Sequence, residues 1–224
     1  MLRRAVTRVL APARLPLRLL SLTLLAASGC PAAAAAPVVP VYVPAPETEG
    51  APQLDGDTWI GAGPLHSIRL TRIGDEARQA YIRKAVGSDT DPFASRPDQP
   101  EGYLTYLLQL ANPGDAALIF NPGHCWLFTG NEVRTPLGPA DVSFSYQLAD
   151  SGFPPAYEKA GQVLLHRMRV IEAGESLHGL LVYRAPKPST RNFTVDVQLS
   201  LSTGDIVKFS APYRRLTKKE LRQP

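Results

Sequence analysis

The chain has 224 residues, with 24 Lys and Arg against 20 Asp and Glu, and 44% of its positions are apolar. Two cysteines are too few for a disulfide scaffold, and 17 glycines are too few for collagen. The apolar content excludes a wholly disordered chain, and the length suits one ordinary domain with additional segments.

Residues 1–29 have the pattern of an export signal. Residues 1–18 contain five arginines and no acidic residue, and residues 19–25 form a short apolar run. The uncharged stretch over 19–29 has 11 residues, whereas a helix needs about 20 residues to cross a bilayer. This segment is therefore predicted to be a cleaved signal peptide and not a permanent transmembrane helix.

The signal peptide leads into the sequence Ala27-Ser28-Gly29-Cys30. These residues resemble the lipobox of bacterial lipoproteins, in which the cysteine thiol is diacylated, the signal is cut before the cysteine, and the new amino terminus is acylated. The resemblance implies a lipid anchor of the palmitate type on Cys30, which attaches the protein to a membrane of the bacterial cell envelope. By resemblance to the sorting of enterobacterial lipoproteins, Pro31 in place of aspartate favours the outer membrane over the inner membrane. A signal cut elsewhere is the alternative.

Cleavage changes the charge balance, because five of the 24 basic residues lie in the signal and leave 19 basic against 20 acidic side chains. The sequence pI of about 9.2 therefore largely reflects the precursor, and nucleic-acid binding loses its support. Basic residues gather in a tail at 214–224, which either contacts anionic lipid or another acidic partner, or is a solvated, frayed end. The cations of this tail are Arg214, Arg215, Lys218, Lys219 and Arg222.

Residues 30–56 are predicted to form the lipidated cysteine and a Pro/Ala-rich tether. Six prolines lie within 31–52, beside an alanine run at 32–36, and no apolar periodicity is present that could organise a core. At about 3.1 Å per residue, the extended tether would reach roughly 70 Å. It is therefore expected to hold a domain clear of the bilayer.

Residues 57–213 alternate short apolar segments with turn signals and are predicted to form the folded domain. One clear helix is predicted at 75–86, because Asp75 can cap its first turn and Gly87 can end it in a left-handed conformation. The predicted apolar stripe of this helix consists of Ala77, Ala80, Tyr81 and Ala85.

The remaining elements are expected to be short strands. Asn121-Pro122-Gly123 is interpreted as a turn between two of them, and Thr203-Gly204-Asp205 as the turn of the strongest hairpin. Alternation favours a strand within 141–150, with a short helix as the alternative. Phe93 is expected to pin the loop at 88–102 to the core. Strands are predicted over 65–73, 103–111, 116–120, 124–129, 132–135, 163–171, 177–183, 193–202 and 206–210.

Short strands with no βαβ alternation indicate an antiparallel β-sandwich. The segments 103–112, 118–120, 171–175 and 179–183 resemble those of the immunoglobulin-like domains of many bacterial lipoproteins and secreted proteins. The resemblance covers roughly residues 60–213 and implies a mainly all-β fold with one short N-terminal helix. Such domains mostly bind or present other molecules and do not catalyse reactions. The Cys…Trp…Cys spacing of antibody domains is absent from this sequence.

The sequence contains no nucleophile elbow, Cys-x-x-Cys pair, phosphate-binding loop or zinc-hydrolase motif. We therefore expect a protein that is not an enzyme and uses no cofactor. The leading hypothesis is an envelope lipoprotein whose sandwich is an interaction or scaffolding module for another envelope protein or for peptidoglycan. The loop at 88–102 and the basic tail are the candidate contact surfaces, because binding residues are disproportionately found on loops.

The alternative hypothesis is a periplasmic copper-binding lipoprotein that uses His166, Met168 and His178. If the chain folds back symmetrically about Gly174, Val170 faces His178, and His178 lies diagonally beside Met168. Two imidazoles and a thioether suit copper better than calcium or magnesium. The competing interpretation is that Met168 fills the core and that the histidines are packed or solvated.

Cys125 lies between His124 and Trp126 on a predicted strand. Once Cys30 is acylated, Cys125 has no intramolecular partner. It is either a buried free thiol, or a reactive thiol or intermolecular disulfide.

Overall fold

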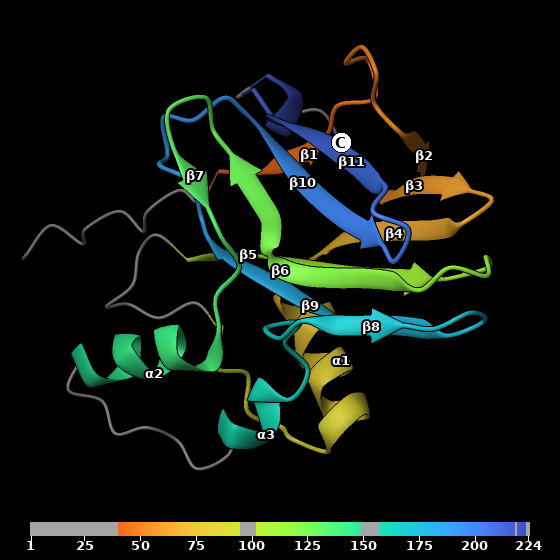
Figure 1. The fold of residues 1–224 in the computed structure, drawn as a ribbon. Coiled ribbons are helices and arrows are strands. Elements are labelled where there is room, and N and C mark those ends of the chain that lie inside the picture. The colour runs from red at the N-terminus through yellow and green to blue at the C-terminus, as the bar shows by residue number, and fades with distance from the viewer. Residues whose placement is uncertain (1–39, 95–101, 149–156, 218, 223–224) are drawn as a thin grey trace, which may run out of the picture. The chain divides into compact units, whose positions relative to one another are not determined.

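The computed structural model describes residues 40–94, 102–148, 157–217 and 219–222, so the signal peptide, the lipobox and Cys30 lie outside the described residues. The described chain forms two antiparallel sheets (Figure 1). Sheet A consists of β1 (Tyr42–Pro44), β6 (Leu118–Phe128), β7 (Val133–Arg134), β8 (Arg169–Ile171), β10 (Asn192–Leu201) and β11 (Ile206–Arg215). Sheet B consists of β2 (Gln53–Asp55), β3 (Thr58–Gly63), β4 (His66–Ile73), β5 (Tyr103–Ala111) and β9 (Ser176–Arg184).

The strand order is β1-β11-β10-β6-β7 in sheet A, with β8 also paired to β6, and β2-β3-β4-β5-β9 in sheet B. The predicted hairpin of β10 and β11 is confirmed, with Ser200 opposite Ile206 and Gly204 in the left-handed region at φ 95°. Within the described residues, three α-helices accompany the sheets where the sequence predicted one. They are α1 (Asp75–Val86), α2 (Pro139–Leu148) and α3 (Tyr157–Gly161), and a 3-10 turn follows at Glu220–Arg222.

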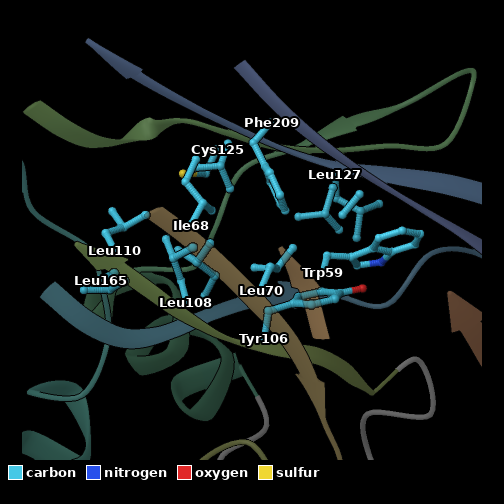
Figure 2. Packing of buried hydrophobic residues seen from close by; sticks show 14 of the residues in the cluster. Trp59, Ile68, Leu70, Tyr106, Leu108, Leu110, Cys125, Leu127, Leu165 and Phe209 are labelled. Carbon is cyan, nitrogen blue, oxygen red and sulfur yellow. The ribbon is translucent and has the colours of Figure 1, made fainter. Parts of the chain in front are cut away.

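The main core lies between the two sheets, which confirms the predicted mainly β sandwich. Every second residue of β10 points into this core and is buried, as period-2 alternation requires. Figure 2 shows Trp59, Ile68 and Leu70 of sheet B packed with Cys125 and Phe209 of sheet A.

A second apolar cluster lies on the other face of sheet B, under the helices. It joins Ile82 of α1 and Val142 of α2 to Leu180 and Val182 of β9. Sheet B is therefore covered on both faces, whereas the outward-facing side chains of β10 are half-buried and those at the start of β11 are exposed. Sheet A thus keeps one open face. Within the described residues, no helix is long and apolar enough to span a membrane.

Helix α1 has the predicted bounds, and Gly87 ends it at φ 65° with its N–H donated to Arg83 O. Two other predictions about this helix are wrong. The residue at the N-cap is Gly74, with no side-chain cap, because Asp75 is already helical and pairs with Arg78 at 3.1 Å. The buried residues are Arg78 and Ile82, and the three alanines of the predicted stripe are exposed.

Residues 139–148 form helix α2, so the strand favoured by alternation is wrong and the helical alternative is confirmed. Pro139 starts the helix, where its missing N–H costs nothing. The Asp141 carboxylate accepts a 2.8 Å hydrogen bond from the Gly138 N–H, which satisfies a donor at the helix entrance. These start signals outweigh an alternating pattern of side chains.

The predicted tether at 30–56 ends earlier than expected, because β1 and β2 lie within it. Tyr42 of β1 is buried and packs edge-on against Phe193 at 4.9 Å between ring centroids. Each of these strands has only three residues, which is too short to give a visible period in the sequence. The segment between Cys30 and the first strand is therefore residues 31–41.

The described part of the tail at 214–224 is folded and not frayed. Strand β11 continues to Arg215, and Thr217 and Glu220 then cap each other in the manner of a capping box. The Glu220 N–H donates to Thr217 Oγ1 at 3.3 Å, and the Thr217 N–H donates to Glu220 Oε2 at 2.8 Å. These hydrogen bonds, with Arg214 beside the carboxylate, lower the pKa of Glu220 to about 2.

Candidate functional site

The structure does not assemble the predicted copper site. Strand β8 pairs with β6 of sheet A, whereas β9 pairs with β5 of sheet B, so Val170 faces Ile119 and the predicted hairpin about Gly174 is wrong. Met168 is 65% exposed and does not fill the core. Within the described residues, no group of three or more His, Cys, Asp or Glu side chains is placed to hold a metal ion.

The two histidines of that hypothesis do share a surface pocket of about 650 Å³ with Ser143 and Glu158. His178 Nδ1 lies 2.8 Å from the Tyr81 hydroxyl, and His166 Nδ1 lies 3.0 Å from Leu164 O. Because a carbonyl only accepts, His166 carries its proton on Nδ1. Each histidine therefore has a protein partner on one ring nitrogen, and the thioether that would complete the set is outside the pocket lining.

The pairing of β6 with β10 is interrupted by an irregularity in β6. Val197 pairs with Cys125 and Leu199 with Phe120, so the four residues 121–124 lie opposite the single residue Gln198. The predicted turn at Asn121-Pro122-Gly123 is therefore a bulge inside one strand and does not reverse the chain. Asn121 Oδ1 accepts the Gly123 N–H at 2.9 Å and holds the bulge. Bulges re-aim the side chains beside them and are common at functional sites.

Beyond the bulge, three aromatic side chains follow one another on the open face of sheet A. We call His124, Trp126 and Phe128 the aromatic strip. They alternate with Cys125 and Leu127, which are fully buried, so the strip points away from the core. Ring centroids are 5.9 Å apart between His124 and Trp126 and 6.2 Å apart between Trp126 and Phe128. Phe128 is 36% exposed.

Polar side chains of β10 lie beside the aromatic strip. In register, Asp196 is opposite Trp126, and Thr194 is opposite Phe128. Burial raises the pKa of Asp196, while a hydrogen bond from the Ser210 hydroxyl opposes that shift. Its Oδ1 is shielded from solvent and has no hydrogen-bond partner among the described residues. The face therefore combines aromatic rings, of which Phe128 is exposed and His124 and Trp126 are half-buried, with polar side chains of the neighbouring strand.

The aromatic strip is not among the site residues predicted from the sequence. His124, Cys125 and Trp126 are correctly predicted to share one strand, but only the thiol is considered there as a reactive group. The sequence signal that could have revealed the strip is that apolar or aromatic residues occupy both alternating sets of positions along this strand. Only one of the two faces is buried in the structure.

The fold buries or pairs residues of two other candidates from the sequence, Cys125 and the loop at 88–102. Cys125 is a buried free thiol, and burial raises its pKa to about 12, so it carries almost no thiolate near neutral pH. In the loop at 88–102, Phe93 is buried as predicted, and Asp91 binds Arg78. The rest of this loop, at 95–101, lies outside the described residues.

No family model and no curated protein matches the chain. Among solved structures, a FixG-related protein from Vibrio parahaemolyticus has a TM-score of 0.32 and 11% identity, over 70% of this chain and 100% of that one. A protein provisionally named a lipoprotein, ycdA, from Bacillus subtilis has a TM-score of 0.36 and 13% identity, over 72% of this chain and 40% of that one. These scores support no conclusion about function.

Proposed function

We propose that the chain is a lipid-anchored protein of the bacterial cell envelope, at the outer membrane, whose sandwich binds peptidoglycan without catalysis. The observation that carries the proposal is the aromatic strip on the open face of sheet A. The lipobox at 27–30 supplies the anchor, and Pro31 after it favours the outer membrane. The first strand of the fold begins after a segment of only 11 residues that follows Cys30.

The surroundings of the strip favour a glycan over a flat protein partner. A sugar ring has an apolar face of C–H groups and a rim of hydroxyl and amide groups. Binding sites for such ligands pair apolar or aromatic walls with a few placed polar groups. Trp126 supplies the aromatic face, while Asp196 and Thr194 lie in register beside it. The glycan strands of peptidoglycan offer both kinds of group in the envelope compartment.

The anchor is tested by labelling cells with radioactive palmitate. The unchanged protein is expected to incorporate label and to fractionate with membranes, whereas Cys30→Ser should lose both, because the lipobox thiol is the site of acylation. Cys125→Ser is the matched control, since the chain has only two cysteines. Label that persists in Cys30→Ser would show that the anchor assignment is wrong.

Binding is tested by sedimentation with purified peptidoglycan sacculi, using the chain from residue 30 onward with Cys30→Ser. Trp126→Ala is expected to weaken binding roughly thirtyfold, because a central aromatic anchor typically contributes about 2 kcal/mol or more. Ile206→Ala, which truncates an exposed apolar side chain on a different strand of sheet A, should leave binding unchanged. Equal binding by the unchanged chain and Trp126→Ala, or no binding by either, would overturn the glycan assignment.

A further inference from the structure

A basic hollow of about 460 Å³ lies on the surface where β10 begins and β11 ends. Its lining residues are Arg191, Asn192, Arg214, Arg215, Leu216 and Thr217. We propose that this hollow binds the phosphate headgroups of anionic phospholipids, so that this end of the domain docks on the membrane that carries the anchor. The inference rests on the lipid anchor proposed above and adds a second, electrostatic contact with the same membrane.

The hollow lies beside the point at which the chain enters the fold. The Leu216 N–H donates to Val41 O at 2.9 Å, and Tyr42 pairs with Arg215. Residues 31–41 alone separate the lipidated cysteine from β1, and at about 3.1 Å per residue in a polyproline conformation they would span roughly 34 Å. The anchor is therefore attached to the end of the domain that holds the hollow.

The three arginines of the hollow differ in how they are held. Arg214 pairs with Glu220 at 2.8 Å and with Glu47 at 3.3 Å, and Arg215 donates to Pro188 O. Among the described residues, no carboxylate pairs with Arg191 or Arg215. Two cations are thus left without a neutralising partner, and one of them is already oriented by a backbone carbonyl.

Guanidinium groups suit phosphate because their planar N–H donors match two phosphate oxygens at once. Lys219 is exposed in the segment that follows the hollow and adds a further cation. Near an anionic leaflet, each Lys or Arg contributes roughly a fivefold gain in membrane binding. This contribution decays within a Debye length of about 8 Å at physiological salt, so it requires a close approach, which the short tether permits.

The test uses the chain from residue 30 onward with Cys30→Ser, which contains every described residue and no lipid. Vesicles of phosphatidylcholine alone are compared with vesicles of equal parts phosphatidylcholine and phosphatidylglycerol. The chain is expected to sediment with the anionic vesicles only. Arg191→Glu combined with Lys219→Glu should lower the partition coefficient at least roughly twentyfold.

The matched control is Lys84→Glu combined with Lys159→Glu, which makes the same charge change at exposed positions on α1 and α3. It should retain nearly full binding. The milder pair Arg191→Gln with Lys219→Gln covers the case in which charge reversal disturbs folding, and it should still reduce binding several-fold. If both double glutamate variants lost membrane binding equally, only the net charge of the chain would matter, and the assignment of the hollow would be overturned.

Inorganic phosphate separates a lipid surface from a soluble phosphate compound. At equal ionic strength, phosphate should displace the chain from anionic vesicles no better than chloride does. Complete displacement by phosphate alone would overturn the lipid assignment. The assay contains no acylated cysteine and no peptidoglycan, so its failure is distinguishable from failure of the proposed function, which the palmitate and sacculus experiments test separately.

Discussion

Arg78→Met is expected to lower the free energy of unfolding by about 3–5 kcal/mol, because it leaves a buried carboxylate without its partner. Arg78 is 1% exposed on α1. Its Nε donates to both carboxylate oxygens of Asp91, at 3.1 and 2.9 Å, and its Nη2 donates to Phe93 O at 2.8 Å. Nη1 also reaches Thr105 Oγ1 at 3.2 Å. The measurement is equilibrium unfolding in urea, followed by tryptophan fluorescence.

Arg83→Met on the same helix is the control for Arg78→Met. Arg83 pairs with Asp89 at 2.6 Å, but the two side chains are 62% and 81% exposed. Exposed ion pairs contribute at most about 1 kcal/mol, so this variant should unfold almost like the unchanged protein. A similar loss in both variants would mean that helix propensity, and not the buried network, accounts for the destabilisation.

The Arg78 network shows why the sequence predicts α1 but not its buried face. The bounds of the helix follow from local signals, namely acidic residues in the first turn, basic residues in the last, and Gly87. The buried face depends on Asp91, which lies beyond the helix in the loop. Arginine is rarely buried without a partner, and that partner is visible only in three dimensions.

Strand pairing likewise has a part that the local sequence predicts and a part that it does not. The alternation of β10 and the turn at Gly204 are local, and the hairpin with β11 is correctly predicted from them. The segment Glu172-Ala173-Gly174-Glu175-Ser176 has an equally good local signal for a turn, and Gly174 does adopt φ 77°. Even so, β8 and β9 lie in different sheets. A turn sequence specifies that the chain bends but does not specify which sheet each arm joins.

The candidate site is the feature least accessible from the sequence. The predicted approach of His178 to Met168 depends on a register that the structure does not contain, although His166 and His178 line one pocket. The aromatic strip depends on the bulge at 121–124, whose sequence is that of a turn. The outward orientation of Trp126 and its neighbours follows only from knowing that the other face of β6 is buried.

Asn112→Ala is expected to lower the free energy of unfolding by about 3 kcal/mol, because three hydrogen bonds are lost in a buried site. Asn112 is 1% exposed and follows β5 at the crossing from sheet B to sheet A. Its Nδ2 donates to Ala116 O and to Ile171 O, both at 2.9 Å, and its Oδ1 accepts the Gly114 N–H at 3.1 Å. Urea unfolding again provides the measurement.

The position of Asn112 explains why its substitution should lower the free energy of unfolding more than that of an ordinary turn residue. Its main chain accepts the Gly174 N–H at 2.8 Å and donates to Glu175 O at 3.0 Å. One residue therefore holds the β5–β6 crossing to the β8–β9 crossing. The side-chain bond to Ile171 O reaches β8 of sheet A, so Asn112 also ties the end of β5 in sheet B to β8 in sheet A.

Two variants distinguish this role from that of a generic turn. Asn121→Ala removes one hydrogen bond of the same kind in the more exposed bulge of β6 and should cost at most about 1 kcal/mol. Asn112→Asp keeps the acceptor for Gly114 but places a carboxylate against two carbonyl oxygens, so it should destabilise at least as much as Asn112→Ala. If Asn112→Asp were as stable as the unchanged chain, the bonds to Ala116 and Ile171 would contribute nothing, and the crossing would be held by its main chain alone.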